Sequence, residues 1–249
     1  IIADYGWRIG YQFLALIVFV SVPTIIFLLQ SRKISTRNRE AVDQHGWSLP
    51  AAIKTSYFWR MGIAYFFGTF AATGMVVHLI PHLLNEGLPY SRATQIASMI
   101  GFGLITGRLI TGWLMDRYTP SYVGALMLLL SALGLLVLAL GGEGLAFIGA
   151  LAIGFCIGAE LDIIGFLTAR YFGMRSYGQI YGALYMLCAG GTAVSPIFYG
   201  IVFDRFGSYH PGIFIGSTTL ILAGFLIFSL PKQGSLSPIS PMTLRGAIE

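Results

Sequence analysis

Long apolar runs separated by short polar stretches dominate the pattern of this chain. Each run is as long as the about 17–25 residues that cross a bilayer. Each is also too long and too uniformly apolar for a β-strand. The pattern therefore predicts an all-α, multi-pass membrane protein. We expect seven spans, at about residues 9–30, 57–84, 92–115, 122–141, 145–169, 178–203 and 211–231.

The polar connections divide the chain into parts. Residues 31–54 form the long polar connection, which predicts a cytoplasmic linker with room for a short surface helix. The Ser/Pro-rich residues 232–249 predict a disordered cytoplasmic tail. Residue 1 is Ile, and no charged region of a signal peptide precedes the first span. We therefore expect that the N-terminal part of a larger protein is missing.

Composition and charge agree with a membrane protein. Hydrophobic residues make up 56% of the chain and charged residues 10%, against about 25% charged residues in soluble domains. The net charge of +5 does not indicate nucleic-acid binding, because the basic residues sort by side. The alternation predicts a multi-pass protein of the cell (plasma or inner) membrane. The cytoplasmic set is Arg32, Lys33, Arg37, Arg39, Lys54, Arg117, Arg170, Arg175, Lys232 and Arg245, and the opposite set is Arg8, Arg92 and Arg205.

A charged motif closes the third span. In "GRLITGWLMDRYTP" (107–120), Gly112, Asp116 and Arg117 form G-x-x-x-D-R at a cytoplasmic helix end. Gly112 would let a neighbouring helix approach closely. Asp116 could face the positive N-terminus of another helix, and Arg117 could bond carbonyls or an acid. Such a group can latch two helices in one conformation. The alternative is an ordinary helix end with snorkelling charges.

The motif resembles the loop signature of the major facilitator superfamily, in its second copy between helices eight and nine. "YFGMRSYGQIYGALY" (171–185) and "CAGGTAVSP" (188–196) extend the resemblance over helices ten and eleven. Positions 118–120 depart from the usual signature. A short echo of "DYGWR" (4–8) in "DRFGSY" (204–209) fits a duplicated transporter.

The resemblance implies a twelve-helix transporter that works by alternating access. Residues 1–30 would then be the last helix of the N-terminal half, and residues 55–231 a C-terminal six-helix bundle. Within the superfamily the pattern resembles bacterial members that are similar to monocarboxylate porters and oxalate/formate antiporters.

Three charged residues lie deep in the predicted spans. An ionisable residue there costs about 2.5–3.5 kcal/mol or more, so it normally faces a cavity or a partner. Arg108, Glu160 and Asp162 lie at similar levels near the midplane, so we expect one polar site. The two acids point about 200° apart on one helix. We favour Glu160 as the cavity acid, and the alternative is a structural cluster that joins helices eight and ten.

The resemblance adds a role for Arg108. Monocarboxylate porters carry an arginine here that binds the substrate carboxylate, and an acid one turn earlier. Leu104 occupies that earlier position. Either Glu160 or Asp162 then supplies the acid, or the mechanism differs.

His78, His82 and Glu86 share one helical face at i, i+4 and i+8, an arrangement that resembles metal ligands. The segment contains Pro81 and ends at the outer surface, so we do not expect a metal site. His78 is a candidate for substrate gating or pH sensing, and the alternative is a simple interfacial histidine.

These patterns predict a secondary active transporter that moves a small organic anion with protons. Its partners would be the substrate, the proton, the bilayer and the missing N-terminal half, with no cofactor and no nucleic acid. An efflux transporter for hydrophobic drugs is the alternative. No Walker loop, G-x-S-x-G or H-E-x-x-H motif occurs in the sequence, so a membrane enzyme or a seven-helix receptor is a distant alternative and we expect no enzyme.

Overall fold

The computed structural model describes residues 46–231, together with residues 8–9, 11–12, 15–16, 18–20 and 22–23. The chain divides into two units, residues 1–44 and 45–249. The described residues of the first unit are helical. Most of the span predicted at 9–30, most of the linker and the whole tail lie outside the described residues.

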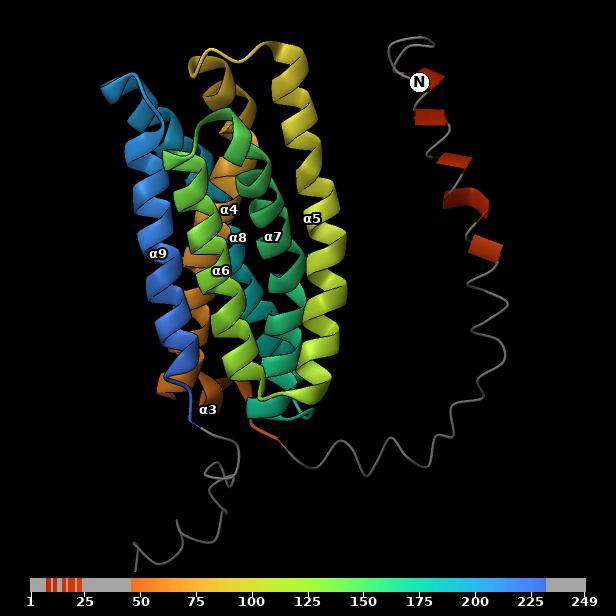
Figure 1. Ribbon diagram of the computed structural model, residues 1–249. Coiled ribbons are helices and arrows are strands. Elements are labelled where there is room, and N and C mark those ends of the chain that lie inside the picture. The colour runs from red at the N-terminus through yellow and green to blue at the C-terminus, as the bar shows by residue number, and fades with distance from the viewer. Residues whose placement is uncertain are drawn as a thin grey trace, which may run out of the picture. The chain divides into compact units, whose positions relative to one another are not determined.

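Six long helices form the second unit (Figure 1). All six are long and apolar enough to cross a membrane, which confirms the six spans predicted in this part of the chain. The described residues contain no strand, only an isolated bridge between Gly46 and Gly173. The helices are α4 (Ser56–Asn85), α5 (Tyr90–Arg117), α6 (Pro120–Leu140), α7 (Gly142–Phe172), α8 (Tyr177–Phe206) and α9 (His210–Phe228).

The end of the linker docks on the bundle. The short helix α3 (Leu49–Ile53) lies within the predicted linker. Before it, the backbone N–H of Trp47 donates to the carbonyl of Phe172 at 2.8 Å. After it, the Thr55 side chain accepts from the backbone N–H of Phe58 at 3.3 Å and caps α4. The last residues of the linker are therefore fixed to the end of α7.

The principal packing pairs are α4 with α8, α5 with α7, and α6 with α9. The α5–α7 pair packs backbone against backbone, because glycines on each helix meet the other. A Cβ at any of these glycines would overlap main-chain atoms of the facing helix, so only glycine allows this approach. The contacts are Gly103 with Leu151, Gly107 with Phe155, Gly154 with Ile100 and Gly158 with Leu104.

Candidate functional site

An ion pair joins α5 and α7 on the surface of the bundle, away from the helix ends. Arg108 Nε lies 3.3 Å from Asp162 Oδ2, and the two side chains are 50% and 39% exposed. Arg108 lies nine residues before the end of α5 and Asp162 ten before the end of α7. Both are therefore about 14–15 Å from the same end of the bundle. The other ion pairs among the described residues lie at helix ends.

The structure pairs Arg108 with Asp162 and not with Glu160, the acid that we favoured for the cavity. Asp162 shares a helical stripe with Gly158 and Gly165, and Gly158 contacts α5. Glu160 shares its stripe with core residues such as Ile164 and Leu167, which are fully buried. The face of small residues therefore turns Asp162 toward Arg108, whereas Glu160 turns into the bundle.

A row of tyrosines from α8 lies beside the ion pair. Tyr177, Tyr181 and Tyr185 stack in sequence, with ring centroids 5.7 and 6.1 Å apart. The Tyr177 hydroxyl lies 3.2 Å from the place where a Cβ of Gly165 would be. Tyr181 is close enough to Asp162 to interact electrostatically with it. The sequence analysis missed this row, although tyrosines at i, i+4 and i+8 mark one helical face.

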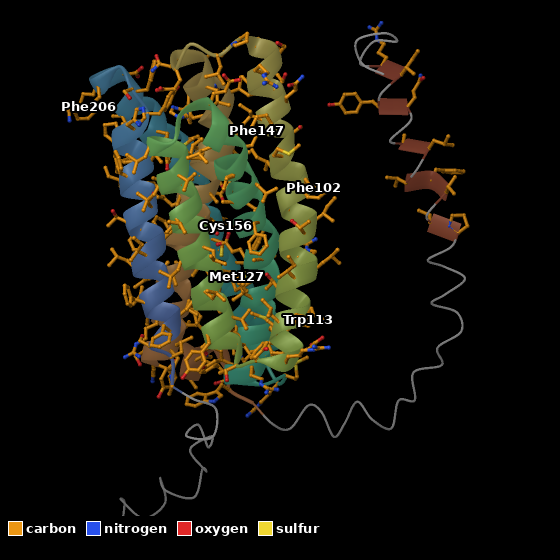
Figure 2. All side chains as sticks on the ribbon, viewed as in Figure 1. Phe102, Trp113, Met127, Phe147, Cys156 and Phe206 are labelled. Carbon is orange, nitrogen blue, oxygen red and sulfur yellow. The ribbon has the colours of Figure 1, made fainter. Side chains whose placement is uncertain are left out.

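Glu160 lies in a different environment from Asp162. It is 5% exposed, and its Oε1 has no hydrogen-bond partner within the part of the chain that the structure describes. It lines a cavity of about 10 Å³ between α4, α6 and α7, with Tyr65, Met127 and Cys156 among the other lining residues. Figure 2 shows Met127 and Cys156 near the middle of the bundle. The structure therefore separates Glu160 from Arg108.

His78 of α4 contacts α8 and Tyr209, the residue before α9. Its Nε2 lies 3.0 Å from the carbonyl oxygen of Pro196 and its Nδ1 3.4 Å from the Tyr209 hydroxyl. Burial, with a smaller contribution from Asp204, raises the pKa of Tyr209, so its hydroxyl keeps its proton. In a neutral ring, Nε2–H then donates to Pro196 and Nδ1 accepts from Tyr209. His78 lies seven residues before Asn85, where α4 ends, and Arg108 lies eighteen residues after Tyr90, where α5 begins. These two helix ends are adjacent, so His78 and Arg108 lie at different depths in the bundle.

His82 and Glu86 line a second cavity at the outer end. Its volume is about 290 Å³, and His210 and Glu143 also line it. His82 is buried, and its Nδ1 has no partner among the described residues. Glu86 Oε1 lies 3.0 Å from His210 Nε2. No group of three or more His, Cys, Asp or Glu side chains in the described part of the chain could hold a metal ion.

The proposed latch residues lie on an exposed surface of α5. A Cβ on Gly112 would meet nothing within 4 Å. Asp116 is exposed, and it forms no ion pair with the described residues. The guanidinium of Arg117 lies 4.2 Å from the ring centroid of Trp113, which Figure 2 shows at the outer side of α5. This structure does not bring the motif to another helix, and the latch stays a prediction.

Comparison with known proteins identifies the family. The model of the Major Facilitator Superfamily matches residues 1–196. The chain therefore belongs to this superfamily of membrane transporters, which are not enzymes, as the motifs at 107–120 and 171–196 predicted.

Individual relatives are similar only at low identity. The human monocarboxylate transporter 11 is 28% identical over 197 residues, which cover 73% of this chain and 42% of that protein. A gallate transporter of Pseudomonas putida is 29% identical over 178 residues, covering 63% of this chain and 38% of that protein. The chain thus spans less than half of the length of these relatives.

Solved structures show the same fold. The superfamily transporter FucP in its outward conformation matches with a TM-score of 0.66 at 18% identity, over 90% of this chain and 55% of that one. A crystal structure of the Escherichia coli fucose:proton symporter matches with a TM-score of 0.59 at 20% identity, over 72% of this chain and 45% of that one. At such identities the likeness concerns the fold alone.

Proposed function

We propose that this chain is the C-terminal part of a secondary active transporter that moves a small, monocarboxylate-like organic anion together with protons. It would work by alternating access in the cell membrane. Residues 1–30 would be the last helix of the N-terminal half, and residues 55–231 the C-terminal bundle. The cytoplasmic side would carry the linker and the end of α5. The observation that carries the proposal is the half-exposed Arg108–Asp162 ion pair, which lies nine and ten residues from the ends of α5 and α7.

The chemistry of the pair suits exchange of one carboxylate for another. The planar guanidinium of Arg108 can bind a carboxylate through two parallel hydrogen bonds. An incoming anion would take the place of Asp162 on Arg108. The released Asp162 would then take up a proton, because a bare carboxylate without its partner is costly in low dielectric. Anion and proton would therefore bind together.

The tyrosine row supports carboxylates that carry an aromatic ring. Tyr181 lies 3.8 Å from the place where a Cβ of Gly165 would be, one turn after Asp162, so a ring attached to a carboxylate on Arg108 would extend toward the row. Offset aromatic stacking contributes about 0.5–1.5 kcal/mol beyond burial. The names of the monocarboxylate and gallate transporters among the relatives refer to carboxylate substrates, which agrees with a carboxylate as the substrate proposed here.

A drug efflux transporter of the same superfamily is the second candidate. The close α5–α7 packing favours it, because Arg108 and Asp162 would then be a structural pair that only joins two helices. In that case, substrates without a carboxylate would be transported and would not compete for Arg108.

Counterflow uptake separates the two candidates. The full-length protein, reconstituted in proteoliposomes, is tested with labelled aliphatic and aromatic monocarboxylates, sugars and hydrophobic drugs. We expect exchange of monocarboxylates and a loss of affinity of at least about tenfold in Arg108→Lys, since an ammonium cannot replace the planar fork. Arg92→Lys, at the outer end of α5, is the matched control. Uptake of drugs alone, or unchanged carboxylate exchange in Arg108→Lys, contradicts the proposal.

A further inference from the structure

Two buried polar groups line one cavity in the middle of the bundle. The Oε1 atom of Glu160 and the hydroxyl of Tyr65 are both buried and have no hydrogen-bond partner among the described residues, and the two residues are 5% and 2% exposed. Both line the same cavity of about 10 Å³. Buried polar groups in folded proteins normally form hydrogen bonds, so two unpaired groups that share a cavity need an explanation. The cavity is near the lower limit of about 10–15 Å³ for one water molecule.

The backbone of α4 is shaped around the Glu160 carboxyl group. A Cβ on Gly68 would lie 3.0 Å from Glu160 Oε1, so the missing side chain leaves the carboxyl group its room. The neighbouring Thr69 turns its hydroxyl away and donates to the carbonyl of Cys188 in α8 at 3.0 Å. The absence of a side chain at Gly68 therefore leaves space for one carboxyl group beside α4.

Among the described residues, no cation pairs with Glu160 to balance a charge. From the helices packed around it, the titratable groups that interact with it are Tyr65 on α4, Cys156 on α7 and Cys188 on α8. None of these side chains carries a positive charge in any protonation state. The one basic residue at a similar depth in the described helices, Arg108, pairs with Asp162 instead. An isolated buried carboxylate is far more costly than the neutral acid.

We propose that Glu160, Tyr65 and the cavity between them form a proton-binding site that is separate from the Arg108–Asp162 pair. Glu160 holds the proton as a neutral acid, and one water in the cavity links it to the Tyr65 hydroxyl. A metal ion does not suit the site, because hard cations need about six oxygen ligands and most of the lining is apolar. The ligand that fits one carboxyl group, one hydroxyl and one water is a proton.

In this proposal, Glu160 and Asp162 of α7 have different roles. This step rests on the proposed function, in which Asp162 takes up one proton when a substrate displaces it. If Glu160 binds and releases a second proton in each cycle, a monocarboxylate enters with two protons. One positive charge then crosses the membrane per cycle. Transport of the anion is driven by the membrane potential as well as by the pH gradient.

An infrared measurement tests the site without any substrate. The purified full-length protein should show the carbonyl band of a protonated carboxylic acid at neutral pH, and the band should be absent from Glu160→Gln. Tyr65→Phe keeps the shape of the ring but removes the hydroxyl, so the band should stay and its frequency should shift. Glu143→Gln, on the exposed end of the same helix, should leave the band unchanged. A band that persists in Glu160→Gln, or that never appears in the unmodified protein, overturns the proposal.

A transport measurement tests the charge per cycle. In proteoliposomes without a pH gradient, an inside-negative potential of 100 mV should drive accumulation of a labelled monocarboxylate by up to about 50-fold, the limit for one charge. Glu160→Gln should reduce this ratio to about onefold and keep counterflow, and Glu143→Gln should behave like the unmodified protein. Accumulation in Glu160→Gln equal to that of the unmodified protein overturns the second proton.

The two tests separate this proposal from the proposed function. An infrared band that disappears in Glu160→Gln, in a protein that exchanges no carboxylate, supports the proton site and contradicts only the substrate class. Carboxylate exchange by a protein whose infrared spectrum does not change in Glu160→Gln supports the substrate class and overturns the proton site.

Discussion

Gly158 of α7 lies directly against the backbone of Leu104 in α5, and the paired charges follow one turn later on each helix. Arg108 is four residues after Leu104, and Asp162 is four residues after Gly158. The two helices run in the same direction, so the contact brings the two side chains to one level. The ion pair therefore depends on a glycine that carries no charge.

Gly158→Ala should destabilise the protein, because its Cβ would overlap the main chain of α5. Overpacking of this kind costs about 1–3 kcal/mol. Thermal unfolding of the purified full-length protein measures the change. Gly144→Ala on the same helix is the control, since a Cβ there meets nothing within 4 Å. Equal melting temperatures of the two variants would show that the close contact is not needed.

Length and composition were enough to predict six helices and their order, because a bilayer span leaves a strong apolar signal. Depth along each helix also predicted that Arg108 and Asp162 share a level. The partner of Arg108 could not be decided, because the rotation of α7 depends on contacts with neighbouring helices. The sequence likewise gives no means to tell Gly158, which meets another backbone, from Gly112, which meets none.

The latch motif should affect the rate of transport more than binding. Asp116 is exposed in this structure, so we expect its partner, the first turn of α8 near Tyr177, in another conformation of the cycle. Asp116→Asn should lower the maximal transport rate at least about fivefold and change the KM less than twofold, consistent with a coupling of about 1 kcal/mol. Kinetics of the full-length protein measure both. Asp204→Asn, at the outer end of α8, is the control, and a selective rise of the KM would contradict the latch.

The sorting of basic residues predicts the topology. In a background in which Cys156 and Cys188 are replaced by Ser, a membrane-impermeant thiol reagent should label Ser91→Cys in intact cells. Ser35→Cys, in the linker, should react only after the membrane is opened. Labelling of Ser35→Cys from outside would reverse the predicted orientation and with it the sidedness of α5 and α7.

His78 should contribute to stability at the outer end rather than to substrate binding at mid-membrane. It bonds Pro196 and Tyr209, and it lies at a different level from Arg108. His78→Ala should lose about 1–3 kcal/mol, because two part-buried partners lose a bond, and Tyr209→Phe about 1 kcal/mol. Unfolding and the KM are measured in parallel. A raised KM with unchanged stability in His78→Ala would favour the gating role.

Tyr181 should select for aromatic carboxylates. It stacks between Tyr177 and Tyr185 and lies beside Asp162, so its ring would face a substrate held by Arg108. Tyr181→Ala should raise the KM of an aromatic carboxylate by about 2–12-fold, the equivalent of 0.5–1.5 kcal/mol of stacking. The KM of an aliphatic carboxylate should change less than twofold, since it keeps its bond to Arg108. Tyr122→Ala, which removes a tyrosine whose ring packs at a tilt against Phe228 instead, is the matched control. Equal changes for both substrates in Tyr181→Ala would mean that the tyrosine row only supports the helix packing.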